Sequence, residues 1–231
     1  MKKLPFYSEL AYIVGILFLA FGTALITKAD FGLSMIVAPA YLIHLKVSQY
    51  LPFFSFGMAE YVFQALLILL MCLIVRRFRV GYLFSFVTAV LYGLTLDAMV
   101  ALTAALPADG YVLRAVYFAV GLVFCTAGVA LLLNTYLAPE AYELFVKEIC
   151  YKFHYRIDRF KTFYDFSSCL LAIVLSFLFF GFGRFVGINF GTIICAVLNG
   201  WLIGCFGRFF LKRLAFRDLL PLRKYFEGDE K

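Results

Sequence analysis

Six long apolar runs dominate this sequence of 231 residues. Charged residues, prolines or glycines bound each run, and a helix of about 20 mostly apolar residues crosses the hydrocarbon layer of a bilayer. The runs cover residues 8–27, 58–75, 80–104, 112–133, 166–183 and 186–207. Since a soluble domain of this length could not hide a chain that is 65% hydrophobic, we expect an all-α, polytopic membrane protein with six transmembrane helices.

The basic residues orient these spans, because lysines and arginines near span ends stay on the cytoplasmic side. With the N-terminus inside, seventeen of the 21 basic residues fall in cytoplasmic segments, and the outer side keeps Lys28, Lys46, Arg114 and Arg184. The sequence therefore predicts a multi-pass protein of the plasma (inner) membrane with both termini in the cytoplasm. The same distribution explains most of the net charge of +7 without a nucleic-acid partner.

An internal repeat divides the chain into two halves of three spans. A shift of 106 residues aligns six identities within twelve positions, and a shift of 107 aligns six more further on. They include the pairs Gly15 and Gly121, Phe18 and Phe124, Gly22 and Gly128, and Gly93 and Gly200. A unit of three spans starts its second copy on the opposite side, so we expect a 3+3 inverted-topology repeat with units 1–106 and 107–231. Chance matching of apolar segments is the alternative.

A basic amphipathic segment at residues 140–163 joins the fourth and fifth spans. Its apolar residues recur at helical spacing, and basic residues such as Lys147 and Lys152 take the other face. We expect this segment to lie on the anionic inner leaflet, and docking of a cytosolic partner is the alternative. A basic C-terminal tail after Arg208 adds to the same surface.

The segment after the first span carries Lys28, Asp30, Gly32 and Ser34, and a short apolar stretch with Pro39 comes next. The stretch is too short to cross the membrane, which predicts a re-entrant or interfacial segment on the outer side. In that case Lys28, Asp30 and Ser34 form the outer approach to a substrate site. An ordinary loop with a Lys28–Asp30 surface pair is the alternative.

Glu60 and Gln64 lie one helical turn apart near the outer end of the second span. A carboxylate inside hydrocarbon is costly and usually faces a cavity or a partner, so Glu60 is a candidate for substrate contact or a proton-linked gate. The alternative is that Glu60 reaches the interface and contacts water. Asp165 aligns with Glu60 at a shift of 105 and opens the fifth span, where the helix dipole also favours an acid.

Polar side chains follow one stripe of the third span and recur in the sixth. The candidate substrate-binding residues of these stripes are Ser85, Thr88 and Tyr92 in the third span and Asn189, Thr192 and Asn199 in the sixth. Two such faces can line one solute path, or they can form hydrogen bonds between helices. The glycines of the sixth span, Gly200 and Gly204 among them, are expected to pack closely against a neighbouring helix.

Catalytic and cofactor motifs are missing from the sequence. It holds no Walker-type loop, no HExxH and no GxSxG, and its six cysteines have no metal-ligand spacing. We therefore expect no enzyme activity, no cofactor and no metal site.

Three segments carry a resemblance to a known family. They are KADFGLS after the first span, FSFGMAEY at the second span, and GINFGTIICAVLNGWLIG in the last. With these segments the chain resembles the YczE/YitT-like family of bacterial integral membrane proteins over nearly its whole length, although Met35 stands where a proline is common in the family. The resemblance implies a transporter-like protein of the plasma membrane. In size and span number the chain is also distantly similar to the substrate-binding membrane subunits of energy-coupling-factor vitamin importers.

The main functional hypothesis is a small-solute permease that works by alternating access around a polar midplane site, with Tyr92 and Asn199 as contacts. Its partners are the lipid bilayer and a small-molecule solute. A variant is the solute-binding membrane subunit of an ATPase-driven importer. The second hypothesis is a membrane scaffold or sensor that acts through segment 140–163 and the basic tail. A cytoplasmic partner or a homo-oligomer remains open in both.

Overall fold

The chain folds almost entirely into helices in the computed structural model, which describes residues 4–79 and 81–219. The elements are β1 (Leu4–Tyr7), α1 (Ser8–Ala29), α2 (Ala38–Val47), α3 (Phe56–Val75), α4 (Gly81–Ala104), α5 (Tyr111–Leu133), α6 (Ala141–Phe153), α7 (Ile157–Phe180), α8 (Phe190–Arg213) and β2 (Leu214–Arg217). Six of these helices are long and apolar enough to cross a membrane: α1, α3, α4, α5, α7 and α8. The predicted all-α, six-span membrane fold is confirmed.

The last two spans differ most from the predicted boundaries. The fifth span was expected at 166–183, but α7 begins at Ile157 and ends before Gly181, whose φ of 98° favours glycine. The sixth was expected from 186, but α8 begins after Asn189, which forms a capping box with Thr192. Hydropathy locates the apolar part of a helix, whereas polar caps and positive φ angles set its ends.

The basic segment 140–163 is not one helix. It breaks after α6, where His154 takes a left-handed conformation with φ of 55°, and α7 starts three residues later. Tyr142, Phe145 and Ile149 on the apolar side of α6 are buried in a cluster with residues of α3. Because protein covers this apolar side, the expectation that the whole segment lies on the inner leaflet is wrong for α6. Among the described side chains of the segment, the large apolar ones that stay exposed are Tyr151, Phe153, Tyr155 and Phe163.

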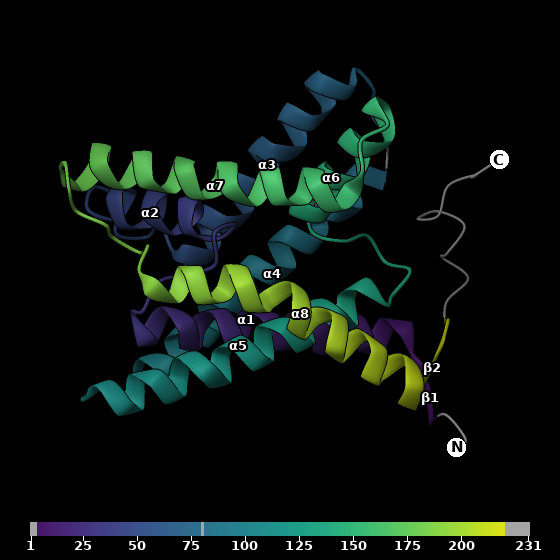
Figure 1. The fold of residues 1–231 in the computed structure, drawn as a ribbon, viewed down its shortest axis with the longest axis horizontal. Helices are drawn as coiled ribbons and strands as arrows, with labels where there is room; N and C mark the ends of the chain where they lie inside the picture. Colours follow the sequence, from purple (N-terminus) through teal and green to yellow (C-terminus); the bar gives the residue numbers. More distant parts are fainter. Residues whose placement is uncertain (1–3, 80, 220–231) are drawn as a thin grey trace.

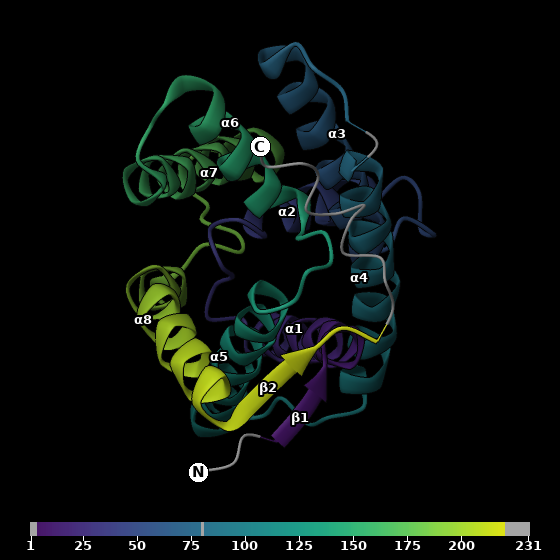
Figure 2. The ribbon, with the colours of Figure 1, turned by 90° about the vertical axis from the view of Figure 1, so that its right-hand side faces the viewer.

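The helices lie in two groups in both views of the ribbon (Figures 1 and 2). The helices α2, α6 and α7 lie on one side, α1, α5 and α8 lie on the other, and α4 runs along one edge between them. We call the end with α2 and the α7–α8 connection the α2 end. The opposite end carries α6 and the two short strands, and we call it the α6 end.

The two halves meet where α1 crosses α5. Gly22 lies against Gly121 and Gly15 against Gly128, so closely that an added Cβ would fall within about 3 Å of the neighbouring helix. These are the glycines that align at a shift of 106, and exchanging each for its counterpart turns one contact into the other. Phe18 and Phe124, which align with each other, meet edge to face with ring centroids 4.9 Å apart. Reciprocal contacts of this kind are the geometry of a two-fold axis.

Most of the remaining helix contacts follow the same exchange, with two exceptions. The pair α1–α4 has its counterpart in α5–α8, and α2–α7 has its counterpart in α6–α3. The larger exception is α3–α4, which pack along each other, whereas α7 and α8 make few direct contacts. The smaller one is α4–α6, since α8 and α2 also make few direct contacts. Asymmetry between the halves is therefore greatest at the contacts of α3 and α4.

Four residues explain why α3 and α4 stay together. Asp97 of α4 accepts hydrogen bonds from Ser55 Oγ (2.5 Å) and Gly57 N (2.7 Å), so it holds the first turn of α3. Gly93 brings the backbones together, because an added Cβ would lie 2.6 Å from Gly57 O. At a shift of 107, Gly204 and Gly200 of α8 stand in place of Asp97 and Gly93, and no heavy atom lies within 4 Å of a Cβ built on either. The expectation that these two glycines pack closely against a helix is wrong for this structure.

The two ends of the described chain form a small parallel sheet. Leu4 to Tyr7 of β1 pair in register with Leu214 to Arg217 of β2. Ser8 Oγ donates a hydrogen bond to Asp218, and Leu219 N donates to the carboxylate of Glu9. Both ends of the six-span bundle therefore lie at the α6 end, as an even number of crossings requires.

Candidate functional site

A cavity of about 380 Å³ lies between the two halves of the chain. Volumes of about 300–1,000 Å³ are typical of small-molecule sites. It is lined by Leu19, Thr23 and Ile26 of α1, by residues 34–37, by Tyr92 of α4, by Cys125, Thr126, Val129, Leu132 and Leu133 of α5, by Pro139, Glu140, Tyr142 and Glu143, by Lys161, Thr162 and Asp165 of α7, and by Cys195, Ala196, Asn199, Gly200 and Ile203 of α8. Both halves thus contribute to one cavity.

Tyr92 and Asn199, the counterpart residues expected at the midplane, both line this cavity. Tyr92 is buried and donates a hydrogen bond to Thr23 Oγ1 at 3.1 Å. The Oδ1 atom of Asn199 is buried without a hydrogen-bond partner among the described residues. Ser34, predicted on the approach, also lines the cavity. Three candidate residues from distant parts of the sequence therefore converge here.

Glu60 and Gln64 form a buried network beside the cavity. Tyr142 lines the cavity and donates a hydrogen bond from its hydroxyl to Glu60 Oε2 at 2.8 Å. Gln64 donates to the same oxygen at 3.5 Å and accepts from Ala141 N at 3.2 Å. Glu60 is fully buried, so the alternative in which it reaches water at the interface is wrong. The Tyr142 hydroxyl thus links the Glu60 carboxylate to the cavity wall through one hydrogen bond.

Three further acids and one base face the cavity where α6 and α7 begin. They are Glu140, Glu143, Asp165 and Lys161. Lys161 Nζ lies 3.3 Å from Glu143 Oε1. Glu140 is 9% exposed, and its Oε1 atom, like Oδ1 of Asp165, has no hydrogen-bond partner in the described part of the chain. Two acids of the cavity wall therefore each present an acceptor oxygen that no described residue satisfies.

Burial changes the titration of the groups in this wall that lie outside the spans. It raises the pKa of the Glu140 carboxyl well above its ordinary value, and the negative charges of Glu143 and Glu60 add to the effect, which Lys161 opposes. Burial also raises the pKa of the Tyr142 hydroxyl, and the neighbouring Glu60 adds to that effect. Titratable groups with raised pKa values in a cavity are typical of functional sites.

The mouth of the cavity lies toward the α6 end. Its exposed lining residues include Leu133 at the end of α5, Thr162 in the second turn of α7 and Gly200 of α8. They flank the space between α7 and α8, the pair without close packing.

The α2 end is closed by two non-helical segments that lie side by side. Leu33 N donates to Gly187 O at 3.0 Å, and Gly191 N donates to Phe31 O at 2.8 Å. Gly32 has a φ of 105°, and a Cβ there would lie 2.6 Å from Thr192 Oγ1. The segment after α1 thus runs back into the protein, which supports the re-entrant form of the prediction.

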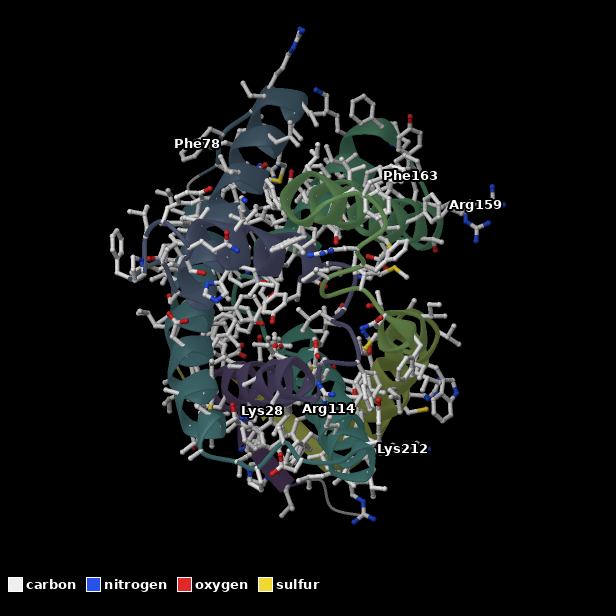
Figure 3. The ribbon with its side chains drawn as sticks, turned by 90° about the vertical axis from the view of Figure 1, so that its left-hand side faces the viewer. Lys28, Phe78, Arg114, Arg159, Phe163 and Lys212 are labelled. Carbon is white, nitrogen blue, oxygen red and sulfur yellow. The ribbon has the colours of Figure 1, made fainter. Side chains whose placement is uncertain are left out.

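Lys28 and Asp30 do not reach the cavity, and they do not pair with each other. Asp30 accepts from Arg114 at 2.8 Å, and Lys28 donates to Ala104 O at 3.1 Å. Figure 3 labels Lys28 and Arg114 close to one another, on α1 and α5. The alternative, an ordinary loop with a Lys28–Asp30 surface pair, does not hold for that pair, because Arg114 at the start of α5 pairs with Asp30.

Three of the other polar residues of the two stripes, Thr88, Asn189 and Thr192, hold helices in place. Thr88 lies 2.6 Å from the Tyr12 hydroxyl and 3.1 Å from Ala138 O. Asn189 and Thr192 cap α8, and Ser85 is fully buried away from the cavity lining. Each stripe therefore combines both expected roles, since only Tyr92 and Asn199 line the cavity.

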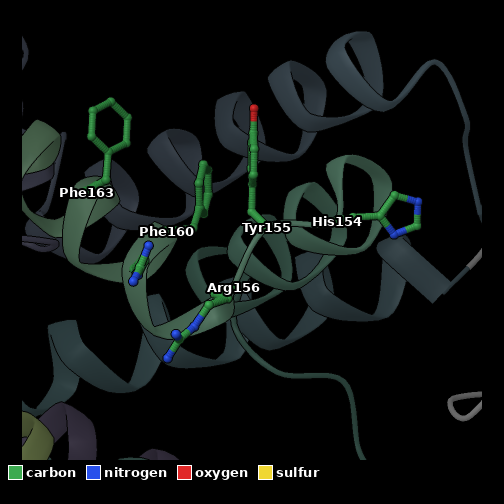
Figure 4. Close-up of a pocket in the computed structure, with 6 residues that line it drawn as sticks. His154, Tyr155, Arg156, Phe160 and Phe163 are labelled. Carbon is green, nitrogen blue, oxygen red and sulfur yellow. The ribbon is translucent and has the colours of Figure 1, made fainter.

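A second hollow lies on the surface at the turn between α6 and α7 (Figure 4). Its walls are His154, Tyr155, Arg156, Arg159, Phe160 and Phe163. The rings of Tyr155 and Phe160 stack at 6.0 Å. All six residues come from one turn of the chain and the hollow is open to solvent, so we regard the cavity between the halves as the candidate site.

Sequence reasoning missed the acids of the cavity wall. Glu140 and Glu143 were assigned to the cytoplasmic amphipathic segment, and Asp165 to a helix start. One signal was present: Glu140 comes after Pro139 and directly before an apolar helix, where a carboxylate is expensive to bury without a role.

Comparison with known proteins places the chain in a family. No curated protein and no solved structure matches the sequence. Residues 6–208, which hold all six spans except the last turns of α8, match the model of a family of unknown function, DUF6198. The chain, with its six spans and its central polar cavity, therefore belongs to the family of unknown function DUF6198.

Proposed function

We propose that the protein is a small-solute permease of the plasma (inner) membrane and not an enzyme. It works by alternating access, with the α6 end and both chain ends in the cytoplasm. The observation that carries the proposal is the cavity of about 380 Å³ to which both halves contribute, with Tyr92 and Asn199 in its wall. The resemblance to YczE/YitT-like proteins remains a prediction that agrees with it.

The inverted repeat supplies the mechanism. The reciprocal contacts of Gly15, Gly22, Gly121 and Gly128 support two units, 1–106 and 107–231, related by a two-fold axis in the membrane plane. In such transporters a site between the repeats opens to each side in turn, as one unit takes up the conformation of the other.

The asymmetry of the halves supports an assignment of the conformational state within the proposed mechanism. In this state α3 is joined to α4 by Asp97 and Gly93, and the cavity is open between α7 and α8 toward the α6 end. The opposite state arises when α7 closes on α8 at Gly200 and α3 separates from α4. The present state is then the inward-open one.

Flux into proteoliposomes tests the proposal. The purified protein is reconstituted and screened over small solutes with and without a pH gradient. We expect saturable uptake of at least one solute, with loss of uptake in Asn199→Ala and altered pH dependence in Glu60→Gln. The permease proposal fails if no solute moves and both variants leave every cellular phenotype unchanged.

The ATPase-driven variant and the scaffold hypothesis make separate predictions. Cytoplasmic subunits that copurify with the protein would favour the importer subunit. The scaffold hypothesis relied on segment 140–163, but the apolar side of α6 faces α3. This leaves the exposed end of α6, with Tyr151, and the aromatic and basic turn after Phe153 for lipid or partners. This makes the scaffold the weaker candidate.

A further inference from the structure

The cavity wall is rich in acceptors that have nothing to bind. Oε1 of Glu140, Oδ1 of Asp165 and Oδ1 of Asn199 are buried without a hydrogen-bond partner among the described residues. A buried acceptor without a partner costs about 1–3 kcal/mol, so a site that keeps three of them is complementary to a ligand that donates hydrogen bonds. The three residues come from the start of α6, from α7 and from α8, and all line the same cavity.

The charge of the cavity wall also favours a ligand that donates hydrogen bonds, and in particular a cation. Three carboxylates, Glu140, Glu143 and Asp165, face one base, Lys161, which is held by Glu143 at 3.3 Å. The ion pair leaves two acids without a basic partner, and Glu140 is buried. An excess of buried negative charge attracts a cation.

The spacing of the acids argues for an organic cation over a metal ion. In the described part of the chain, no group of three or more acids, histidines or cysteines is close enough to hold a metal. Acceptors spread around a cavity of this size suit N–H donors that diverge from one head group, as in a charge-assisted hydrogen bond.

From these features we propose that the cavity binds a small organic cation with a primary ammonium or guanidinium head between Glu140, Asp165 and Asn199. The assignment rests on the proposed permease function, because it names the solute class of that site. The apolar wall of α5, including Val129 and Leu132, takes the hydrocarbon part of the solute.

Binding of the cation is coupled to a proton. Burial raises the pKa of Glu140, and a cation placed beside its carboxylate lowers that pKa again, so the solute displaces a proton. The titratable groups around Glu140 belong to every element that packs near it: Tyr12, Glu60, Tyr92, Cys125, Tyr142, Glu143 and Lys161. Lys161 is the one base among them, and Glu143 neutralises it.

Four compounds with the same butyl chain test the head group. Isothermal titration calorimetry on the full-length protein in micelles compares butylammonium, butylguanidinium, butanol and butyrate. We expect saturable binding of the two cations, release of protons into the buffer, and no binding of butanol or butyrate. Equal binding of butyrate, or binding of none of the four, overturns the assignment.

Matched variants locate the site. Glu140→Gln and Asp165→Asn each remove one negative charge and are expected to weaken butylammonium binding about tenfold or more. Glu148→Gln removes a charge from α6 outside the cavity lining and is expected to leave the affinity unchanged. If Glu140→Gln does not fold, Asp165→Asn decides alone, and wild-type affinity in that variant overturns the assignment.

The two proposals fail separately. Cations that bind in micelles but never enter proteoliposomes would support this site and remove the permease function. Uptake of a neutral or anionic solute without cation binding would keep the permease and overturn the cation site.

Discussion

Tyr142 joins the two halves at the scale of single residues. Its hydroxyl crosses from α6 to the carboxylate of Glu60 on α3, and its ring lines the cavity. Glu60 Oε1 has no hydrogen-bond partner among the described residues, so the hydrogen bonds of the carboxylate are those to its Oε2 atom. Tyr142 therefore connects the cavity wall in one half to a buried acid in the other half.

Tyr142→Phe is expected to lower the free energy of unfolding by about 1–3 kcal/mol, because it removes a hydrogen bond to a buried carboxylate. Denaturation in mixed micelles measures the change. Tyr151→Phe is the control on the same helix, since Tyr151 is 75% exposed, and it should match the wild type. Equal stability of the two variants would contradict the role of this hydrogen bond.

Glu140→Gln is expected to change the pH dependence of stability. The pKa of Glu140 is raised in the folded protein, so the folded state binds more protons than the unfolded state above the ordinary pKa of about 4.3. The stabilising contribution is complete below that pH and is lost as the pH rises through the folded pKa. Thermal unfolding between about pH 5 and pH 8 should show that the variant gains stability relative to wild type as the pH rises. Parallel curves would refute this.

At the scale of helices, the contrast between Gly93 and Gly200 distinguishes the halves. A Cβ on Gly93 would lie 2.6 Å from Gly57 O and 2.9 Å from Tyr61, so the α3–α4 contact has no room for it. The same atom on Gly200 would meet no heavy atom within 4 Å. Two positions that align in sequence therefore have opposite packing.

Gly93→Ala is expected to cost about 1–3 kcal/mol because it forces α3 and α4 apart. Gly200→Ala is expected to be neutral or to add up to about 1 kcal/mol, since alanine favours a helix more than glycine does. Unfolding of both variants in micelles tests the pair. A similar loss in both would mean that α7 and α8 are packed as tightly as α3 and α4.

Hydropathy and charge were enough to predict the six spans, since each needs only a long apolar run. The break at His154 was not predictable from periodicity, because the basic and apolar pattern continues through it. The alignment of Tyr92 with Asn199 did identify two residues of the cavity. Glu140 and Asp165 were missed because their position depends on how α6 and α7 pack, which local pattern does not contain.

At the scale of the whole molecule, the proposed alternating-access mechanism couples the loosely joined pair α7–α8 to the tightly joined pair α3–α4 through the α1–α5 crossing. That crossing has glycines on both sides and keeps one geometry under exchange of the halves. The movements of α3 against α4 and of α7 against α8 are then opposite in sign.

Spin labels on α7 and α8 test this coupling. Labels replace Phe163 and Trp201, which are both exposed, in a variant whose six free cysteines are substituted. Gly93→Leu prevents the close approach of α3 and α4, so we expect it to increase the population with a short α7–α8 distance in electron resonance measurements. An unchanged distance distribution would show that the movement of α7 against α8 is not coupled to that of α3 against α4.

The ladder between β1 and β2 has a consequence for biogenesis. The ribosome delivers residues 4–7 before the six spans, yet their partners at 214–217 emerge only after all six spans have been made. The first strand therefore stays unpaired while the spans are synthesised, and its pairing joins segments that are far apart in sequence. A nascent chain stalled before Leu214 would contain all six spans and still lack the β1–β2 pairing.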